Sequence, residues 1–176
     1  MNNKNNFICI GAVHRDNVLK LKTNYFTNRT NPVLRKKSLG GVAYNIASKI
    51  AIFDQKVELM SLNCIDSIKK EIKKRKIQFR ALNKSIEKRS YTAILDKKGK
   101  MILGLADMDV YEKKTQKLNL KFDSQKKIIF DLNLSLTNIK KIINNYYKRN
   151  IISVCGTSSH KVFKIKNLLN KINILI

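Results

Sequence analysis

The apolar positions of this chain change their period several times, and each change predicts a different element. Residues 7–13 form a short continuous apolar run, which predicts a buried strand that ends at Gly11. Residues 17–38 show no helical period and contain the only proline, Pro32, which indicates extended segments or an exposed flap. From Gly41 onward the apolar positions fall on one face at helical spacing, so we expect a helix to begin there.

The middle of the chain predicts a strand, a basic helix and a hairpin. Residues 57–62 are a strand candidate, and residues 66–76 form a very basic helix with one apolar edge. Residues 90–106 predict a hairpin, because two apolar runs flank a polar turn in which Gly99 supplies a positive φ. The hairpin adds a second β segment to the flap expected earlier in the chain.

The last third of the chain alternates between strand and helix patterns. The expected strands are residues 127–132, 151–155 and 172–176, and the expected helices are residues 136–148 and 159–170. Strands that alternate with helices pair in parallel through right-handed crossovers. We find no internal repeat, and therefore predict a single α/β domain over residues 1–176 with a small β flap.

The net charge of +25 introduces a nucleic-acid-binding alternative. Lys outnumbers Arg by 30 to 7, whereas a surface that reads phosphates is expected to use the bidentate fork of Arg. The lysines are also scattered along the chain rather than gathered in one block. We therefore expect non-specific adhesion to polyanions at low salt, and keep a basic nucleic-acid-binding protein as the lesser alternative.

Several features bear on location and on metals. No secretory signal is expected at the N-terminus, and no stretch approaches the roughly 20 apolar residues that a membrane crossing needs. The three cysteines are widely spaced and form no CxxC pair, which favours reduced thiols in a cytoplasmic protein. His14 and His160 lie far apart in the sequence, so we assign no metal site.

The first candidate for chemistry is the pair Gly40-Gly41, followed by Asn45 on the predicted helix. Paired glycines let the backbone approach a ligand closely, and an Asn amide both donates to and accepts from a sugar hydroxyl. The alternative is a plain glycine turn beside an Asn that faces solvent. The pattern by itself leaves both interpretations open.

Three segments together resemble a known family. Asp16 follows the first strand, Gly40-Gly41 and Asn45 follow the flap, and residues 90–112 include the segment Ala-Asp-Met-Asp-Val-Tyr-Glu. This order resembles the PfkB (ribokinase-like) carbohydrate kinases, and the last segment resembles the pseudouridine kinases in particular. The resemblance implies a ribokinase-like, Rossmann-type three-layer α/β sandwich. It also implies a small β-sheet lid, made by residues of about 17–38 and 90–106.

The resemblance assigns substrate-binding roles near the glycine pair. Asp16 is expected to accept hydrogen bonds from ribose hydroxyls, because an ionised carboxylate binds neighbouring hydroxyls well. Gly40 and Gly41 are expected to bring main-chain amides to the sugar, and Asn45 to fix a further hydroxyl. A small-molecule sugar or nucleoside is therefore the implied ligand.

Further positions are assigned by the resemblance to the remainder of the substrate. Thr92 and Asp107 or Asp109 are expected to approach the base of a nucleoside, with a solvated turn as the alternative for the two aspartates. Asn133 lies at a strand end where ribokinases place a substrate-binding Glu. Its alternative is a structural one, in which Asn133 or Ser135 caps the helix that follows.

The family's phosphoryl-transfer motifs are not found in this sequence. Neither the Gly-Ala-Gly-Asp segment nor the Asn-x-x-Glu motif occurs, so we name no catalytic residue and expect the C-terminal part of the kinase fold to be missing. ATP and Mg²⁺ are expected for the full-length family, with little binding by this chain. The implied function is ATP-dependent phosphorylation of a ribosyl substrate such as pseudouridine, and the alternative is an inactive nucleoside-binding remnant. The resemblance also implies a possible homodimer through the lid.

Overall fold

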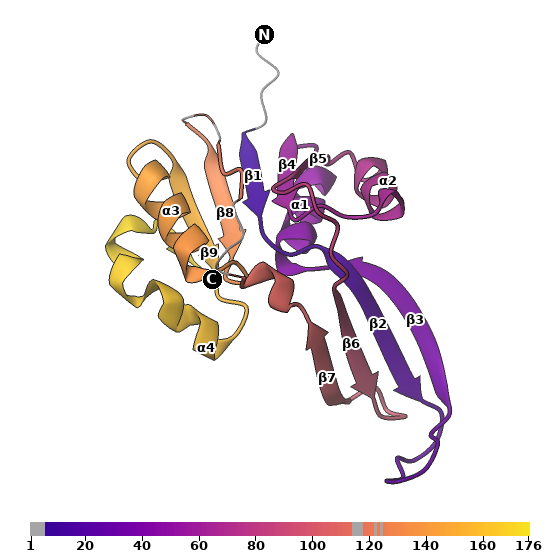
Figure 1. Ribbon diagram of the computed structural model, residues 1–176. Coiled ribbons are helices and arrows are strands. Elements are labelled where there is room, and N and C mark those ends of the chain that lie inside the picture. Colours follow the sequence, from indigo (N-terminus) through magenta and orange to yellow (C-terminus); the bar gives the residue numbers. More distant parts are fainter. Residues whose placement is uncertain (1–5, 114–117, 122, 124) are drawn as a thin grey trace.

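The computed structural model describes residues 6–113, 118–121, 123 and 125–176. Its strands and helices form two sheets, with helices on both faces of the larger one (Figure 1). The strands are β1 (Phe7–Ile10), β2 (His14–Leu21), β3 (Val33–Gly40), β4 (Val57–Ser61), β5 (Gln78–Ala81), β6 (Ser90–Leu95), β7 (Met101–Asp107), β8 (Lys127–Asp131), β9 (Ile151–Cys155) and β10 (Ile174–Leu175). The helices are α1 (Val42–Ile52), α2 (Asp66–Lys74), η1 (Asp109–Tyr111), α3 (Leu136–Tyr146), α4 (Ser159–Val162) and η2 (Phe163–Lys171).

The larger sheet has six strands in the order β10-β9-β8-β1-β4-β5, and all its pairs are parallel. Alternate side chains of each strand point to opposite faces, so the sheet divides the apolar core in two. On one face Ile8 and Ile10 of β1 pack with side chains of α3 and η2. On the other face Cys9 packs with side chains of α1 and α2. This confirms the predicted three-layer α/β sandwich.

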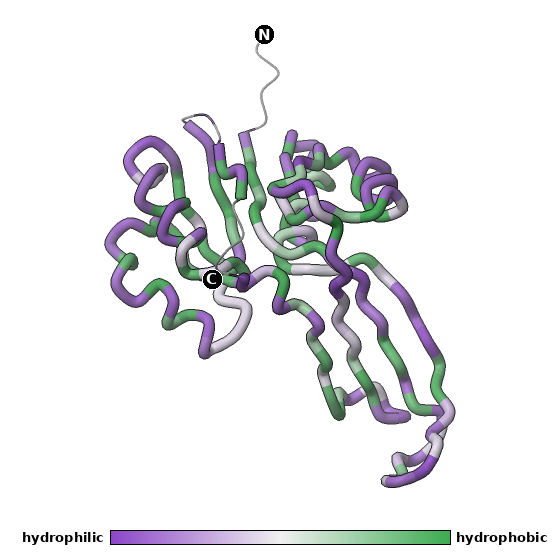
Figure 2. Tube along the Cα trace, in the orientation of Figure 1, coloured by the Kyte–Doolittle hydropathy of each residue, from purple (hydrophilic) through white to green (hydrophobic). Residues whose placement is uncertain are grey.

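The smaller sheet, which we call the projecting sheet, has four strands in the order β3-β2-β6-β7. It consists of two antiparallel hairpins, β2–β3 and β6–β7, joined by the parallel pair β2–β6. Figure 1 shows it extending away from the helices. Figure 2 shows hydrophobic residues on its strands, and Met101, Ile102, Leu103 and Leu105 of β7 are all exposed. The two β segments predicted near residues 17–38 and 90–106 therefore belong to one sheet.

Three local predictions differ from the structure. The strand β5 was not expected, since its four residues are too few to show a period. The helix expected over residues 159–170 is one α-helical turn followed by the 3₁₀ segment η2, in which Ile165 and Leu168 are buried at the three-residue spacing of a 3₁₀ helix. The strand expected to be buried near residue 174 is exposed, because β10 is an edge strand that pairs only with β9.

Two further expectations concern the chain as a whole. The three cysteines are buried and unpaired, as the sequence indicates. Within the described part of the chain, no helix combines the length and the apolar character that a bilayer crossing requires.

Candidate functional site

The candidate site lies where the two sheets meet. The parallel strands β1 and β8 end at the same edge of the six-stranded sheet, with Ile10 beside Phe130. Ligands of open α/β sheets bind outside this edge. From β1 the chain crosses through Gly11, Ala12 and Val13 directly into β2 of the projecting sheet. This three-residue segment, which we call the crossing segment, therefore connects the larger sheet to the candidate site.

The carboxylate of Asp131, at the end of β8, is completely buried beneath the crossing segment. It accepts hydrogen bonds from the backbone N–H groups of Ala12 (2.8 Å), Ala43 (3.2 Å) and Asn133 (3.0 Å). Burial raises the pKa of Asp131, while the N–H donors act in the opposite direction. A Cβ atom at Gly11 would collide with this carboxylate. Asp131 thus fixes the crossing segment against the beginning of α1.

A second cluster holds the crossing segment from the other side. The hydroxyl of Tyr111 accepts from the Val13 N–H (2.8 Å) and lies 3.0 Å from the Val13 carbonyl oxygen and 3.1 Å from Ser61 Oγ. Ser61 Oγ also donates to the carbonyl of Gly11 (2.5 Å). Tyr111 and Ser61 are both fully buried. The crossing segment is consequently fixed at both of its ends.

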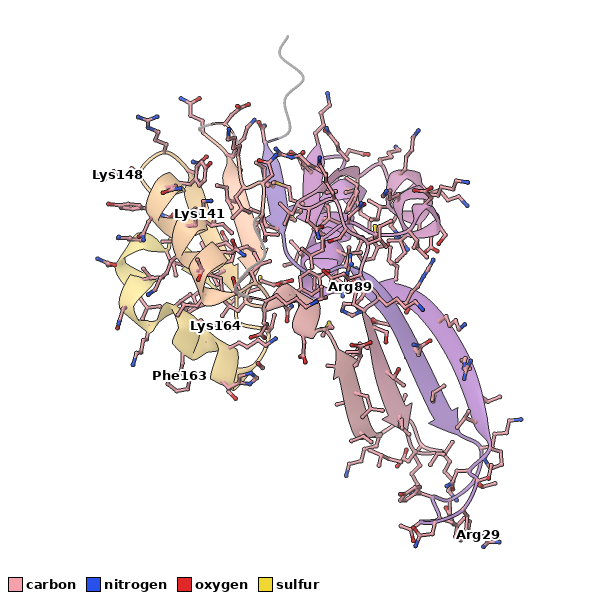
Figure 3. All side chains as sticks on the ribbon, in the orientation of Figure 1. Arg29, Arg89, Lys141, Lys148, Phe163 and Lys164 are labelled. Atoms are coloured by element: carbon pink, nitrogen blue, oxygen red, sulfur yellow. The ribbon has the colours of Figure 1, made fainter. Side chains whose placement is uncertain are left out.

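The buried guanidinium of Arg89 binds four backbone carbonyls at the same junction. It donates to the carbonyl oxygens of Val13 (2.8 Å), Leu62 (2.8 Å), Asn63 (3.0 Å) and Glu87 (3.0 Å). Figure 3 shows Arg89 where the projecting sheet leaves the helices. This side chain therefore joins the ends of the crossing segment and of β4 to the residues that precede β6.

Asp16 and the glycine pair, which the sequence singled out, lie together at this junction. Asp16 is on β2 rather than in a loop after the first strand, and its carboxylate lies against Gly40 at the end of β3, where a Cβ atom would collide with it. His14 Nδ1 is 2.9 Å from Asp16 Oδ1. Burial raises the pKa of Asp16, and His14 opposes this increase. No hydrogen bond of Asp16 Oδ2 occurs among the described residues, so this oxygen is available to a ligand.

Gly41 connects β3 to α1 in a conformation that requires glycine. Its φ is +109°, and a Cβ atom would collide with the carbonyl oxygen of Ala12. That carbonyl accepts a hydrogen bond from the Tyr44 N–H (3.3 Å) in the first turn of α1. The pair Gly40-Gly41 therefore allows β3, the crossing segment and α1 to approach one another closely.

Asn45 lies farther along α1, on its exposed side. It lines an open groove of about 1020 Å³ between α1, α2 and the end of β3, together with Ser38 and Glu71. Within the described residues, no hydrogen bond or ion pair joins Asn45 to Asp16. The structure thus brings Asp16, Gly40 and Gly41 together. Asn45 is joined to Gly41 through its backbone N–H (2.8 Å), while its side chain lies on the exposed face of the helix.

The strand register separates Thr92 from Asp16. In the β2–β6 pair Thr92 lies opposite Asn17, whose amide donates to its hydroxyl over 3.4 Å, while Asp16 lies opposite Tyr91. Neighbouring residues of a strand point to opposite faces, so Thr92 is on the other face of the projecting sheet from Asp16. Tyr91 shares the face of Asp16, and its hydroxyl lies over Gly104 of β7.

The two aspartates near the end of β7 are exposed. Asp107 is the last residue of β7 and Asp109 begins η1, which leads directly to the buried Tyr111. Within the described residues, no hydrogen bond or ion pair of either side chain is found. Both positions are consistent with contact to a ligand and with a solvated turn.

Asn133 is held at the end of β8 by a lysine from α4. Lys161 Nζ donates to Asn133 Oδ1 (2.9 Å) and forms an ion pair with Glu112 (2.8 Å). Lys164, labelled in Figure 3, pairs with the same carboxylate (3.0 Å). The helix cap is Ser135, whose hydroxyl accepts from the Asn138 N–H. Asn133 is therefore not the cap, and its amide is fixed at the edge where ligands bind.

The described residues include no group of three or more His, Cys, Asp or Glu side chains that could hold a metal ion. Within this part of the chain we assign no Mg²⁺ ligand and no contact to ATP phosphates. We derive no phosphoryl-transfer step from it.

Comparison with known proteins gives one curated relative and many solved structures. The chain is 30% identical over 175 residues to a pseudouridine-metabolizing bifunctional protein of Schizosaccharomyces pombe. The alignment covers 93% of this chain and 23% of that protein. No family model matches the chain.

The similar structures share the fold of nearly the whole chain. A carbohydrate kinase from Agrobacterium tumefaciens has a TM-score of 0.79 and 22% identity, with 98% of this chain and 60% of that chain covered. A ribokinase from Cryptococcus neoformans solved with ADP has a TM-score of 0.75 and 12% identity, with 97% of this chain and 56% of that chain covered. A nucleoside kinase of the ribokinase family from Methanocaldococcus jannaschii has a TM-score of 0.73 and 18% identity, with 96% of this chain and 59% of that chain covered. The chain thus spans less than two thirds of each, and the resemblance predicted from the sequence is confirmed.

Proposed function

We propose that this chain, which shares the ribokinase-like (PfkB) carbohydrate kinase fold and a sequence relationship with a pseudouridine-metabolizing protein, binds the ribosyl part of a nucleoside such as pseudouridine. The observation that carries the proposal is the position of Asp16. Its carboxylate lies against Gly40 at the junction of the sheets, with Oδ2 free to accept hydrogen bonds from hydroxyls. An ionised carboxylate in this partly buried place suits neighbouring hydroxyls of a pentose.

The surrounding residues suggest how the ligand is oriented. Gly40 and Gly41 let Asp16 and the crossing segment lie close to the backbone, whose groups are proposed to contact the sugar. Asn133, held by Lys161 at the end of β8, is proposed to approach the sugar from that edge. Asn45, on the exposed side of α1, is proposed to reach a further hydroxyl from the adjacent groove.

The base of the nucleoside is proposed to lie over the projecting sheet, which would act as a lid within one domain that spans the chain. Tyr91 takes the place that the sequence assigned to Thr92, because it shares the face of Asp16 and its ring can stack on a base. Asp107 and Asp109 are proposed to contact the polar edge of the base from the end of β7.

The activity proposed for the protein is ATP-dependent phosphorylation of this ribosyl substrate. The relationship to kinases supports it, and one of the similar structures is a ribokinase with ADP. The residues proposed to bind the sugar lie in the described part of the chain. We assign them no role toward ATP or Mg²⁺, and the alternative is a chain that binds the nucleoside without phosphorylating it.

Calorimetric titration of the 176-residue chain with pseudouridine and with ribose tests the proposal. We expect saturable binding of pseudouridine, and a loss of at least about tenfold in affinity for Asp16→Asn, because the carboxylate no longer accepts from hydroxyls. Gly40→Ala should act similarly by displacing the Asp16 side chain. Asp54→Asn, at an exposed position on the far end of α1, is the matched control and should bind normally.

Two outcomes would contradict the proposal. One is the absence of binding by the unaltered chain at millimolar pseudouridine, and the other is unchanged affinity in Asp16→Asn. Adding ATP with Mg²⁺ to the same titration separates the alternatives, since product formation supports the kinase and indifference to ATP supports the nucleoside-binding chain.

We also propose a homodimer through the projecting sheet. The exposed apolar side chains of Met101, Ile102, Leu103 and Leu105 on its edge strand support this, because an uncovered apolar edge favours pairing with another chain. Sedimentation velocity should show a dimer that Leu103→Lys weakens. A monomer at every concentration tested would contradict this proposal.

A further inference from the structure

His14 is a buried histidine placed directly beside the proposed ligand-binding carboxylate. It begins β2 two residues before Asp16, so both side chains point to the same face of the strand. The distance between His14 Nδ1 and Asp16 Oδ1 is 2.9 Å. Among the described residues neither atom makes a hydrogen bond to any other group, so this 2.9 Å contact is the polar interaction in which both take part. The two groups therefore depend on each other.

The other charges that face this pair come from neighbouring elements. Arg89 lies before β6 and Asp131 at the end of β8, and they act on His14 in opposite directions. Burial has the largest effect and lowers the pKa of His14, while Asp16 raises it. Arg15 is on the opposite face of β2 and pairs with Glu71 of α2 over 2.6 Å, so it does not neutralise Asp16. Among the described residues, His14 is therefore the side chain that forms an ion pair with Asp16.

We propose that His14 is a positioning residue for ligand binding: its Nδ1–H holds Asp16 Oδ1 and leaves Oδ2, beside Gly40, to accept hydrogen bonds from the sugar. This inference rests on the proposed function, because it takes Asp16 as the group that binds the ligand. It goes further by assigning one oxygen of the carboxylate to the protein and the other to the ligand.

The pair also determines how binding responds to acid. Asp16 must be ionised to accept two hydroxyl hydrogen bonds, so binding is present above its pKa and is lost as the pH falls through it. Burial raises the pKa of Asp16 and His14 lowers it. Removal of His14 leaves burial unopposed, and the acid limb of the binding curve therefore moves to higher pH.

The test measures pseudouridine affinity of the full 176-residue chain between about pH 5 and pH 8. We expect His14→Ala to weaken binding about tenfold at pH 6, which is the loss of one hydrogen bond to a charged group. His14→Asn can still donate a hydrogen bond but cannot become charged. It should restore most of the affinity near pH 7.5 while its acid limb stays at higher pH than that of the unaltered protein.

His160→Asn is the matched control, since His160 is exposed on α4 and contacts only Ser158 Oγ (3.3 Å) among the described residues. It should leave both affinity and acid limb unchanged. Because the chain has two histidines, this variant also assigns their NMR signals. In the ligand-free protein, Asp16→Asn should lower the pKa of His14, because Asp16 raises it in the unaltered chain.

The outcomes separate this inference from the proposed function. If Asp16→Asn abolishes binding while His14→Ala keeps the affinity and acid limb of the unaltered protein, the inference fails alone. If Asp16→Asn binds pseudouridine normally, or the unaltered chain does not bind it, the proposed function is wrong. The inference about His14 is then wrong as well, because it depends on that function. A general folding defect in His14→Ala would appear in urea unfolding, and His14→Asn then decides through its acid limb.

Discussion

At the scale of single residues, the buried carboxylate of Asp131 has the clearest structural role. It has no cationic side chain as a partner among the described residues, and three backbone N–H groups from separate segments converge on it. Two of these groups belong to the crossing segment and to the first turn of α1. The position of the glycine pair relative to β8 therefore depends on this one side chain.

Asp131→Asn should lower the free energy of unfolding by about 2–3 kcal/mol, because an amide N–H₂ group would face backbone donors without an acceptor. Urea unfolding at neutral pH measures this value. The control is Asp54→Asn, at an exposed position between α1 and β4, which should change stability by less than about 0.5 kcal/mol. Equal stability of the Asp131 variant would show that the three hydrogen bonds contribute little.

At the scale of elements, Arg89 and Glu112 join separate parts of the molecule through polar contacts. The projecting sheet lacks a helix on either face in the view of Figure 1, so its orientation depends on polar contacts at the junction. Arg89 provides four of these, to the crossing segment, to the residues after β4 and to Glu87. Glu112 connects the segment after η1 to α4.

Arg89→Met should reduce the free energy of unfolding by about 3 kcal/mol, since the carbonyls lose a charged donor in a buried place. Arg89→Lys should recover only part of this, because an ammonium group cannot reach four carbonyls in the fork geometry of a guanidinium. The exposed Arg75→Met on the end of α2 is the control, with an expected change below about 0.5 kcal/mol. Thermal unfolding of the three variants ranks them, and equal values for Met and Lys at residue 89 would contradict the geometric explanation.

Glu112 should give the stability a measurable dependence on pH. Burial raises its pKa, but the ammonium groups of Lys161 and Lys164 outweigh this and hold the pKa below its ordinary value. A carboxyl group with a lowered folded-state pKa stabilises the protein above its unfolded pKa of about 4.3, and this contribution is lost as the pH falls through the folded value. Because Glu112 is partly exposed, the contribution is about 0.5–1 kcal/mol.

Glu112→Gln should therefore be less stable than the unaltered protein at pH 7 by that amount, and the difference should shrink below about pH 4. Urea unfolding of both proteins at several pH values measures it. A difference that stays constant down to pH 3 would show that ion pairing is not its source.

At the scale of the whole molecule, the net charge of +25 dominates interactions with polyanions. The cations of α2 illustrate its distribution, since Lys69 pairs with Asp66 while Lys73 and Lys74 are exposed at the helix end. Such charges favour adhesion through counterion release, without any preference for sequence.

We expect RNA of any sequence to bind at about 50 mM salt and to be released by about 200 mM. Filter binding or fluorescence anisotropy with two unrelated RNA sequences measures this. Tight binding of one sequence and not of the other at the higher salt concentration would favour the nucleic-acid-binding alternative over the nucleoside site.

The sequence by itself determined the order and type of most elements, because apolar periodicity is a local property that each segment carries. It also located the glycine pair, since a positive φ at Gly41 demands that residue type. The family resemblance rested on such local segments and was confirmed. The four residues of β5 carry too little period to be predicted, and the 3₁₀ geometry of η2 was not distinguished from the α-helix expected there.

Only the tertiary structure decided which side chains meet. Asp131 reaches Ala12 across 119 positions, and Tyr111 reaches Val13 across 98, so no local pattern could reveal these contacts. Strand register decided that Tyr91 and not Thr92 shares the face of Asp16, because a shift of one residue exchanges the faces of a strand. Periodicity is encoded within each segment, whereas the partners of a buried polar group are set by how distant segments cross.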